Sequence, residues 1–126
     1  MKENKFSFKK RILSFKYAFN GIAYIYKTQH NSWIHTIFMV LAITLNIVLK
    51  IDLIEWAVIL IVMSIVLVAE IFNTAIELII DFISPNYNKI AGIVKDVAAG
   101  GVLLTVFFAV AVGGIIYLPK INAMFF

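Results

Sequence analysis

Three long apolar segments limit what this chain can fold into. A transmembrane helix needs about 20 mostly apolar residues, and segments 33–50, 54–83 and 97–118 approach or exceed that length. Only 14% of the residues are charged and the mean hydropathy is +0.98, whereas soluble domains average roughly 25% charged residues. We therefore predict an all-α membrane protein with three transmembrane helices in a single domain, residues 1–126. The third helix is expected to end at Pro119.

Lysine and arginine are concentrated before the first predicted transmembrane helix. Seven of the 11 lie there, at positions 2, 5, 9, 10, 11, 16 and 27. Because cationic flanks stay in the cytoplasm, this predicts a cytoplasmic N-terminus and second connection, with the first connection and C-terminus outside. The net charge of +4 suits attraction to anionic lipid. We expect no nucleic-acid partner, since no basic patch alternates with stacking aromatic residues.

Segment 6–28 mixes apolar and basic residues at helical spacing. The apolar positions at three- and four-residue steps are Phe8, Ile12, Phe15, Phe19, Ile22 and Tyr26. This pattern predicts an amphipathic helix, and aromatic residues beside lysines favour a position at the membrane interface. The alternative is a soluble helix packed on another domain, although the rest of the chain offers little to pack against.

The second apolar segment contains the acidic motif AEIFNTAIE, residues 69–77. Glu70, Asn73, Glu77 and Asp81 are spaced so that they share one narrow face of a helix, in its cytoplasmic half. An acidic group at the centre of a membrane helix costs about 2.5–3.5 kcal/mol. We therefore expect this face to line the protein interior, a cavity or a bound cation. The alternative is that protonated or hydrogen-bonded carboxyl groups merely hold helices together.

The spacing within this motif separates two chemical tasks. Glu70 and Glu77 lie about 10 Å apart along the helix axis, too far to bind one metal ion together. Glu77, nearer the water, suits a Mg²⁺ ligand that acts with substrate phosphates, and Glu70 suits a general base for a hydroxyl. Lys95 and Asp96 begin the third segment, where an ammonium and helix N-terminal amides form an anion site. Residues 98–101, AAGG, favour close approach of an acyl chain or, equally, simple helix packing.

These motifs resemble the small bacterial integral-membrane diacylglycerol kinase and undecaprenol kinase family over about residues 15–119. The surface helix and the start of the first span are similar in Phe15-Lys16-Tyr17-Ala18-x-x-Gly21-Ile22 and Asn31-x-Trp33-Ile34-His35. The second span, its exit and the third span are similar in Ala69-Glu70-x-x-Asn73-Thr74-Ala75-Ile76-Glu77, Asp81, Ser84-Pro85-x-Tyr87 and Lys95-Asp96-x-Ala98-Ala99-Gly100. The resemblance implies Mg²⁺-dependent phosphate transfer from ATP to a lipid hydroxyl. It also implies a homotrimer in the bacterial inner membrane, with active sites shared between neighbours.

The same resemblance implies roles for individual residues. Glu70 would be the catalytic base, supported by Asn73, and Glu77 and Gln29 would be the metal ligands. The implied ATP contacts are Lys10 or Arg11, Tyr17, Gln29, Glu77, Asn86, Tyr87, Asn88, Lys95 and Asp96. The implied lipid contacts are Asn31, Trp33, Glu70 and Ala99.

The chain departs from the family pattern at two positions. Gln29 stands where the family usually has an acidic metal ligand, so metal binding is expected to be weaker. Neighbouring His30 would replace it poorly, since Mg²⁺ prefers oxygen ligands. Asn88 stands where a histidine is common.

Two other functions fit parts of the sequence. A small proton- or cation-coupled transporter would use intramembrane carboxylates such as Glu70, but it leaves Lys95, Asp96 and the basic surface helix unexplained. A non-enzymatic membrane assembly subunit would tolerate loss of Glu77. Between the two acceptor lipids, the Asn31-x-Trp33-Ile34-His35 motif more closely resembles the undecaprenol-using branch of the family, which implies undecaprenol rather than diacylglycerol.

Overall fold

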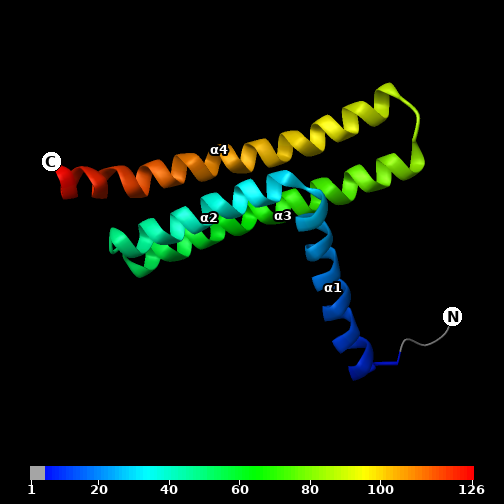
Figure 1. The fold of residues 1–126 in the computed structure, drawn as a ribbon, viewed down its shortest axis with the longest axis horizontal. Helices are drawn as coiled ribbons and strands as arrows, with labels where there is room; N and C mark the ends of the chain where they lie inside the picture. The colour runs from blue at the N-terminus through cyan, green and yellow to red at the C-terminus, as the bar shows by residue number, and fades with distance from the viewer. Residues whose placement is uncertain (1–4) are drawn as a thin grey trace.

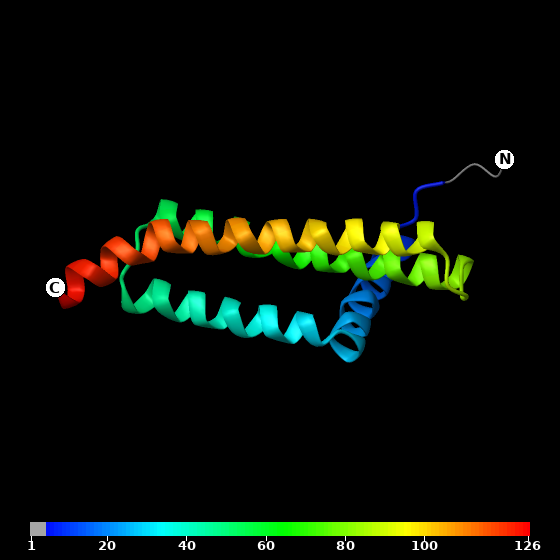
Figure 2. The same cartoon turned by 90° about the horizontal axis from the view of Figure 1, so that it is seen from above.

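The computed structural model describes residues 5–126, which form four helices (Figure 1). Helix α1 spans Phe8–Thr28, α2 His30–Val48, α3 Leu53–Ile83 and α4 Lys89–Phe125. Helices α2, α3 and α4 run side by side in alternating directions, and α1 leaves them at a steep angle (Figures 1 and 2). The all-α prediction is confirmed, and α2, α3 and α4 are each long and apolar enough to cross a membrane. Lys2, counted above among the cytoplasmic cations, lies outside the described residues.

Helices α3 and α4 are longer than α2, and this difference places part of the acidic face beyond the start of α2. At 1.5 Å per residue α2 is about 28 Å long, close to the roughly 30 Å of a bilayer's hydrocarbon core. Helices α3 and α4 are longer, about 46 and 55 Å on the same basis. Both continue past the start of α2 (Figure 1). The second half of the acidic face and Lys95 lie on this extension, at the predicted cytoplasmic end.

The connection between α2 and α3 is short and closed by its own hydrogen bonds. Lys50 adopts a left-handed backbone conformation, φ 51°, and the Ile51 N–H donates to the Asn46 carbonyl at 3.2 Å, as in a Schellman C-cap. Asp52 then caps α3, accepting from the Glu55 N–H at 2.8 Å, while the Glu55 carboxylate accepts from the Asp52 N–H at 3.2 Å. This capping box and the preceding turn place α2 and α3 antiparallel.

Helix α4 is longer at both ends than the predicted span 97–118. It begins at Lys89 because the Asn88 side chain accepts from the Ile90 and Ala91 N–H groups at 2.9 and 3.2 Å. The expectation that Pro119 ends the helix is wrong, since the helix continues to Phe125. Proline removes one N–H from the helical ladder, but proline is tolerated within membrane helices.

Polar contacts join the three long helices at the predicted outer end. The Tyr117 hydroxyl of α4 donates to Asn46 Oδ1 of α2 at 2.6 Å and lies 3.2 Å from the Ala42 carbonyl oxygen. Lys120 of α4 pairs with Glu55 of α3, with Nζ and Oε2 2.9 Å apart. The small buried core nearby is formed by Ile51, Ile59 and Ile116.

Replacing Tyr117 by Phe is expected to destabilise this end of the bundle. Asn46 is 0% exposed, so its carboxamide oxygen would lose a partner that water cannot easily replace, at a cost of about 1–3 kcal/mol. The measurement is the thermal unfolding midpoint in detergent, which should fall. Tyr24→Phe is the matched control, because Tyr24 is exposed. Equal midpoints for Tyr117→Phe and wild type would contradict this assignment.

Candidate active site

Glu70 lies in a small cavity where α1, α2 and α3 meet. Its side chain is only 3% exposed. The cavity has a volume of about 100 Å³ and is lined by Ile22, Ile25, Tyr26, Ser32, Leu67, Glu70 and Ile71. The deepest carboxylate of the acidic face therefore lines a largely apolar chamber within the protein, consistent with the predicted burial. Its catalytic role stays a prediction.

Ser32 shares this cavity and has an unpaired hydroxyl. It is 1% exposed, and its Oγ has no hydrogen-bond partner in residues 5–126. Such an atom normally finds a partner when buried, so the cavity that Glu70 lines also has a polar atom free to form a hydrogen bond. Sequence reasoning missed Ser32, which was the unassigned position between Asn31 and Trp33. The available signal was its three-residue spacing from His35, which puts both on one side of α2.

The corner between α1 and α2 is held by side-chain contacts around Tyr26. The Tyr26 hydroxyl is 2.8 Å from Thr36 Oγ1, and the Trp33 indole N–H donates to the Tyr26 carbonyl at 2.7 Å. The Tyr26 and Trp33 rings also meet edge to face, with centroids 5.2 Å apart. Gln29, between the two helices, has an extended backbone and ends α1. These contacts fix the corner between α1 and α2, which contributes Tyr26 to the lining of the cavity.

Asn73 and Glu77 present oxygen atoms one and two turns beyond Glu70. The Asn73 Nδ2 donates to Glu77 Oε1 at 3.3 Å, and Asn73 Oδ1 is buried with no partner in the described chain. Amide and carboxylate oxygens are ligands that Mg²⁺ accepts, so these atoms fit the predicted metal. Residues 5–126 contain no cluster of three His, Cys, Asp or Glu side chains able to hold a metal ion. Further ligands would have to come from Gln29, substrate phosphates or another subunit.

Lys95 of α4 forms an ion pair with Asp81 of α3. Both side chains are partly exposed, 38% for Lys95 and 63% for Asp81. The pair joins the two helices close to the connection between them, on the extension beyond α2. Asp81, the last carboxylate of the acidic face, therefore pairs with the Lys95 ammonium group at the predicted cytoplasmic end of the bundle.

The remaining predicted ATP and lipid contacts divide into two groups. Those on and after the α3–α4 connection are exposed, namely Asn86, Tyr87, Asn88, Asp96 and Ala99. Those on α1 (Lys10, Arg11 and Tyr17) are exposed on its first half, which lies apart from the α3–α4 connection (Figure 1). At the start of α2, Asn31 and Trp33 are also exposed. Within one chain, the second half of the acidic face and Lys95 therefore lie at the same end of the helix bundle. The predicted ATP contacts on α1 lie apart from them.

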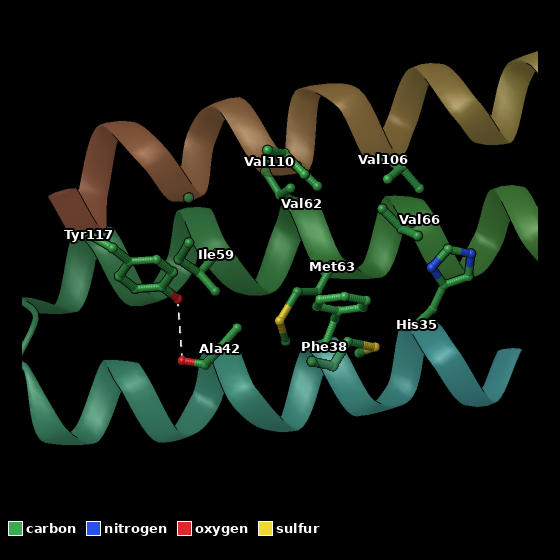
Figure 3. A pocket seen from close by; sticks show the side chains of 13 residues that line it. His35, Phe38, Ala42, Ile59, Val62, Met63, Val66, Val106, Val110 and Tyr117 are labelled. Carbon is green, nitrogen blue, oxygen red and sulfur yellow. Dashed lines mark hydrogen bonds between the residues drawn. The ribbon is translucent and has the colours of Figure 1, made fainter. Parts of the chain in front are cut away.

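A larger apolar cleft lies between α2, α3 and α4, with a volume of about 280 Å³ (Figure 3). Its walls include Phe38 and Met39 of α2, Met63 of α3 and Val110 of α4. His35 lies at one end of the cleft and Tyr117 toward the other (Figure 3). Helix α2 thus contacts α3 and α4 through a loosely filled apolar surface.

Comparison with known proteins relates most of the chain to one family. The model of the prokaryotic diacylglycerol kinases matches residues 16–117. A diacylglycerol kinase from Synechocystis sp. is 40% identical over 114 residues, which cover 90% of this chain and 65% of that protein. An undecaprenol kinase from Bacillus subtilis is 30% identical over 108 residues, covering 86% and 88% respectively. A diacylglycerol kinase from Escherichia coli is 28% identical over 94 residues, covering 69% and 77%. The chain therefore spans just under two thirds of the Synechocystis protein.

Proposed function

We propose that this chain, which belongs to the prokaryotic diacylglycerol kinase family, is a lipid kinase of the bacterial inner membrane. It transfers the γ-phosphate of ATP to the hydroxyl of a membrane lipid, with its N-terminus and the α3–α4 connection in the cytoplasm. The observation that carries this proposal is the buried Glu70 in a largely apolar cavity that is also lined by the unpaired Ser32 hydroxyl. Phosphoryl transfer depends mostly on positioning and electrostatic stabilisation, which a small helical protein can supply.

Glu70 acts as the general base in this proposal. The lipid hydroxyl donates its proton to the Glu70 carboxylate as its oxygen forms a bond to the γ-phosphorus. The bond from that phosphorus to the β–γ bridging oxygen breaks, and ADP leaves with the electron pair. The apolar walls around Glu70 exclude water, which would otherwise compete with the lipid as acceptor.

The nucleotide is placed at the outer part of the same face. Glu77 and Gln29 would hold Mg²⁺, with Asn73 beside them, and the bound ion would neutralise charge on the transferring phosphate. Lys95 and Asp96 contact the triphosphate. The other proposed contacts are Lys10 or Arg11, Tyr17, Asn86, Tyr87 and Asn88. Because the α1 residues lie apart from Lys95 within one chain, we propose a homotrimer in which neighbouring subunits complete each site.

The shape and lining of the Glu70 cavity favour undecaprenol as the acceptor. A polyprenol presents one hydroxyl on a hydrocarbon chain, whereas diacylglycerol also brings two ester groups that need hydrogen-bond donors when buried. The cavity is small and lined mainly by apolar side chains, and the Tyr26 hydroxyl already contacts Thr36. The Ser32 hydroxyl is unpaired, but this one donor would not satisfy two ester groups. Asn31, Trp33 and Ala99 would contact the lipid outside this cavity.

The proposal is tested by supplying both acceptors side by side. Purified full-length protein in detergent receives γ-labelled ATP, Mg²⁺ and either undecaprenol or diacylglycerol. We expect lipid-dependent label transfer, with the larger kcat/KM for undecaprenol. Transfer to neither lipid would contradict the kinase assignment, and a preference for diacylglycerol would contradict only the choice of acceptor.

Gln29→Glu is expected to lower the Mg²⁺ concentration needed for half-maximal rate. A carboxylate supplies the charge that an amide oxygen lacks, and Mg²⁺ favours such ligands. Thr28→Glu is the control, since it adds the same charge one residue away. If Gln29→Glu leaves the Mg²⁺ requirement unchanged or raises it, Gln29 is not a metal ligand.

A further inference from the structure

The imidazole of His35 lies between the two cavities and faces the Glu70 carboxylate. His35 lines the apolar cleft on one side, where its ring projects from α2 toward α3 (Figure 3). On the other side its Nε2 is 3.8 Å from Glu70 Oε2. The His35 side chain is 17% exposed, so this contact lies mostly out of solvent. None of the steps proposed above uses His35.

Other titratable groups near Glu70 do not take the place of this imidazole. On the facing elements and on α3 itself they are Tyr26 of α1, Glu77 and Asp81 of α3, and Lys95 of α4. The Tyr26 hydroxyl contacts Thr36, and Lys95 is paired with Asp81. Along α3, Glu77 and Asp81 lie about 10 and 16 Å beyond Glu70. Within residues 5–126, His35 is the basic side chain within 4.0 Å of this carboxylate.

A carboxylate acts as a base only when one of its oxygens lies within hydrogen-bond reach of the proton it accepts. An imidazole packed against one oxygen of Glu70 restricts rotation of that side chain. Because the contact is made to Oε2, the other oxygen is left to accept from a hydroxyl in the cavity.

We infer that His35 is a positioning residue that keeps Glu70 oriented toward the acceptor hydroxyl. This inference rests on the proposed function, and it adds a residue of α2 to a site whose base lies on α3. The step it supports is the proton transfer from the lipid hydroxyl to Glu70.

Two amide substitutions test which ring nitrogen matters. In His35→Gln the amide nitrogen takes the place of Nε2, and in His35→Asn it takes the place of Nδ1. Since the contact is made by Nε2, His35→Asn should lower kcat by about 10- to 100-fold, because the base is misplaced, and should leave KM for ATP unchanged. His35→Gln should stay close to wild type. Phe38→Leu, which alters the same cleft away from Glu70, should leave kcat unchanged.

Several outcomes would overturn the inference. An unchanged kcat in His35→Asn, or equal losses in both amide variants, would show that His35 only packs. A second readout, the infrared carboxyl bands of Glu70 (identified by their loss in Glu70→Gln), needs no turnover. These bands should differ from wild type in His35→Asn and match wild type in His35→Gln, and identical bands in all three proteins would refute the pairing. Lack of lipid phosphorylation by wild type, with the bands still changed in His35→Asn, would refute the kinase assignment and retain the His35 contact.

Discussion

Replacing Glu70 by Gln is expected to lower kcat by about 10²- to 10⁴-fold, the range typical of a lost general base. Glutamine has nearly the same size as glutamate but cannot accept the hydroxyl proton. The cavity around Glu70 is small and apolar, so water has little room to replace the missing base. Label transfer to lipid measures the rate, and circular dichroism in detergent checks that the helices are retained.

Glu55→Gln is the matched control for this variant. Glu55 is also an acidic residue of α3, but it lies at the opposite end, where it caps the helix and pairs with Lys120. We expect near wild-type kcat and a lower unfolding temperature. Similar losses of kcat in both variants would mean that Glu70 acts through folding rather than through chemistry.

Lys95→Met is expected to lower kcat/KM for ATP by about 10- to 100-fold, because a hydrogen bond to a charged group contributes about 1.5–3 kcal/mol. Lys95 pairs with Asp81 in the chain without nucleotide, and we propose that it contacts the triphosphate when ATP binds. Lys120→Met is the matched control, since Lys120 has an acidic partner, Glu55, at 2.9 Å on the other end of the bundle.

A charge exchange separates the structural and nucleotide roles of Lys95. The double variant Lys95→Asp, Asp81→Lys keeps an ion pair between α3 and α4 but moves the ammonium to another helix. We expect it to recover the unfolding temperature lost in Lys95→Asp without recovering kcat/KM for ATP. Recovery of both would show that Lys95 matters only as a partner of Asp81.

Hydropathy and helical periodicity were sufficient to predict the three long apolar helices and the shared face of Glu70, Asn73 and Glu77. These features depend on residues close together in the sequence. Helix ends were less predictable because they depend on local hydrogen bonds. Asn88 starts α4 eight residues before the apolar segment, and Pro119 does not end it.

The spacing of Ser32 and His35 puts both on one side of α2, but their position near Glu70 could not be predicted because it depends on how the helices pack. Both are polar residues near the start of a membrane helix, where such residues are common at the interface. Only the approach of α2 to α3 and the steep angle of α1 bring them to the Glu70 cavity and its edge. The predicted ATP contacts on α1, such as Arg11 and Tyr17, differ from Ser32 and His35, because within one chain they do not come close to the rest of the predicted site at Lys95.

The most direct test of this account is label transfer from γ-labelled ATP to lipid by wild type and by Glu70→Gln, measured together with saturating Mg²⁺. We expect labelled lipid that depends on added acceptor in wild type and nearly disappears in the variant. Equal labelling by the two proteins would contradict the role of Glu70. If wild type shows no labelling but carries an ATP-independent proton flux in proteoliposomes, the buried carboxylate serves transport and the kinase assignment is wrong.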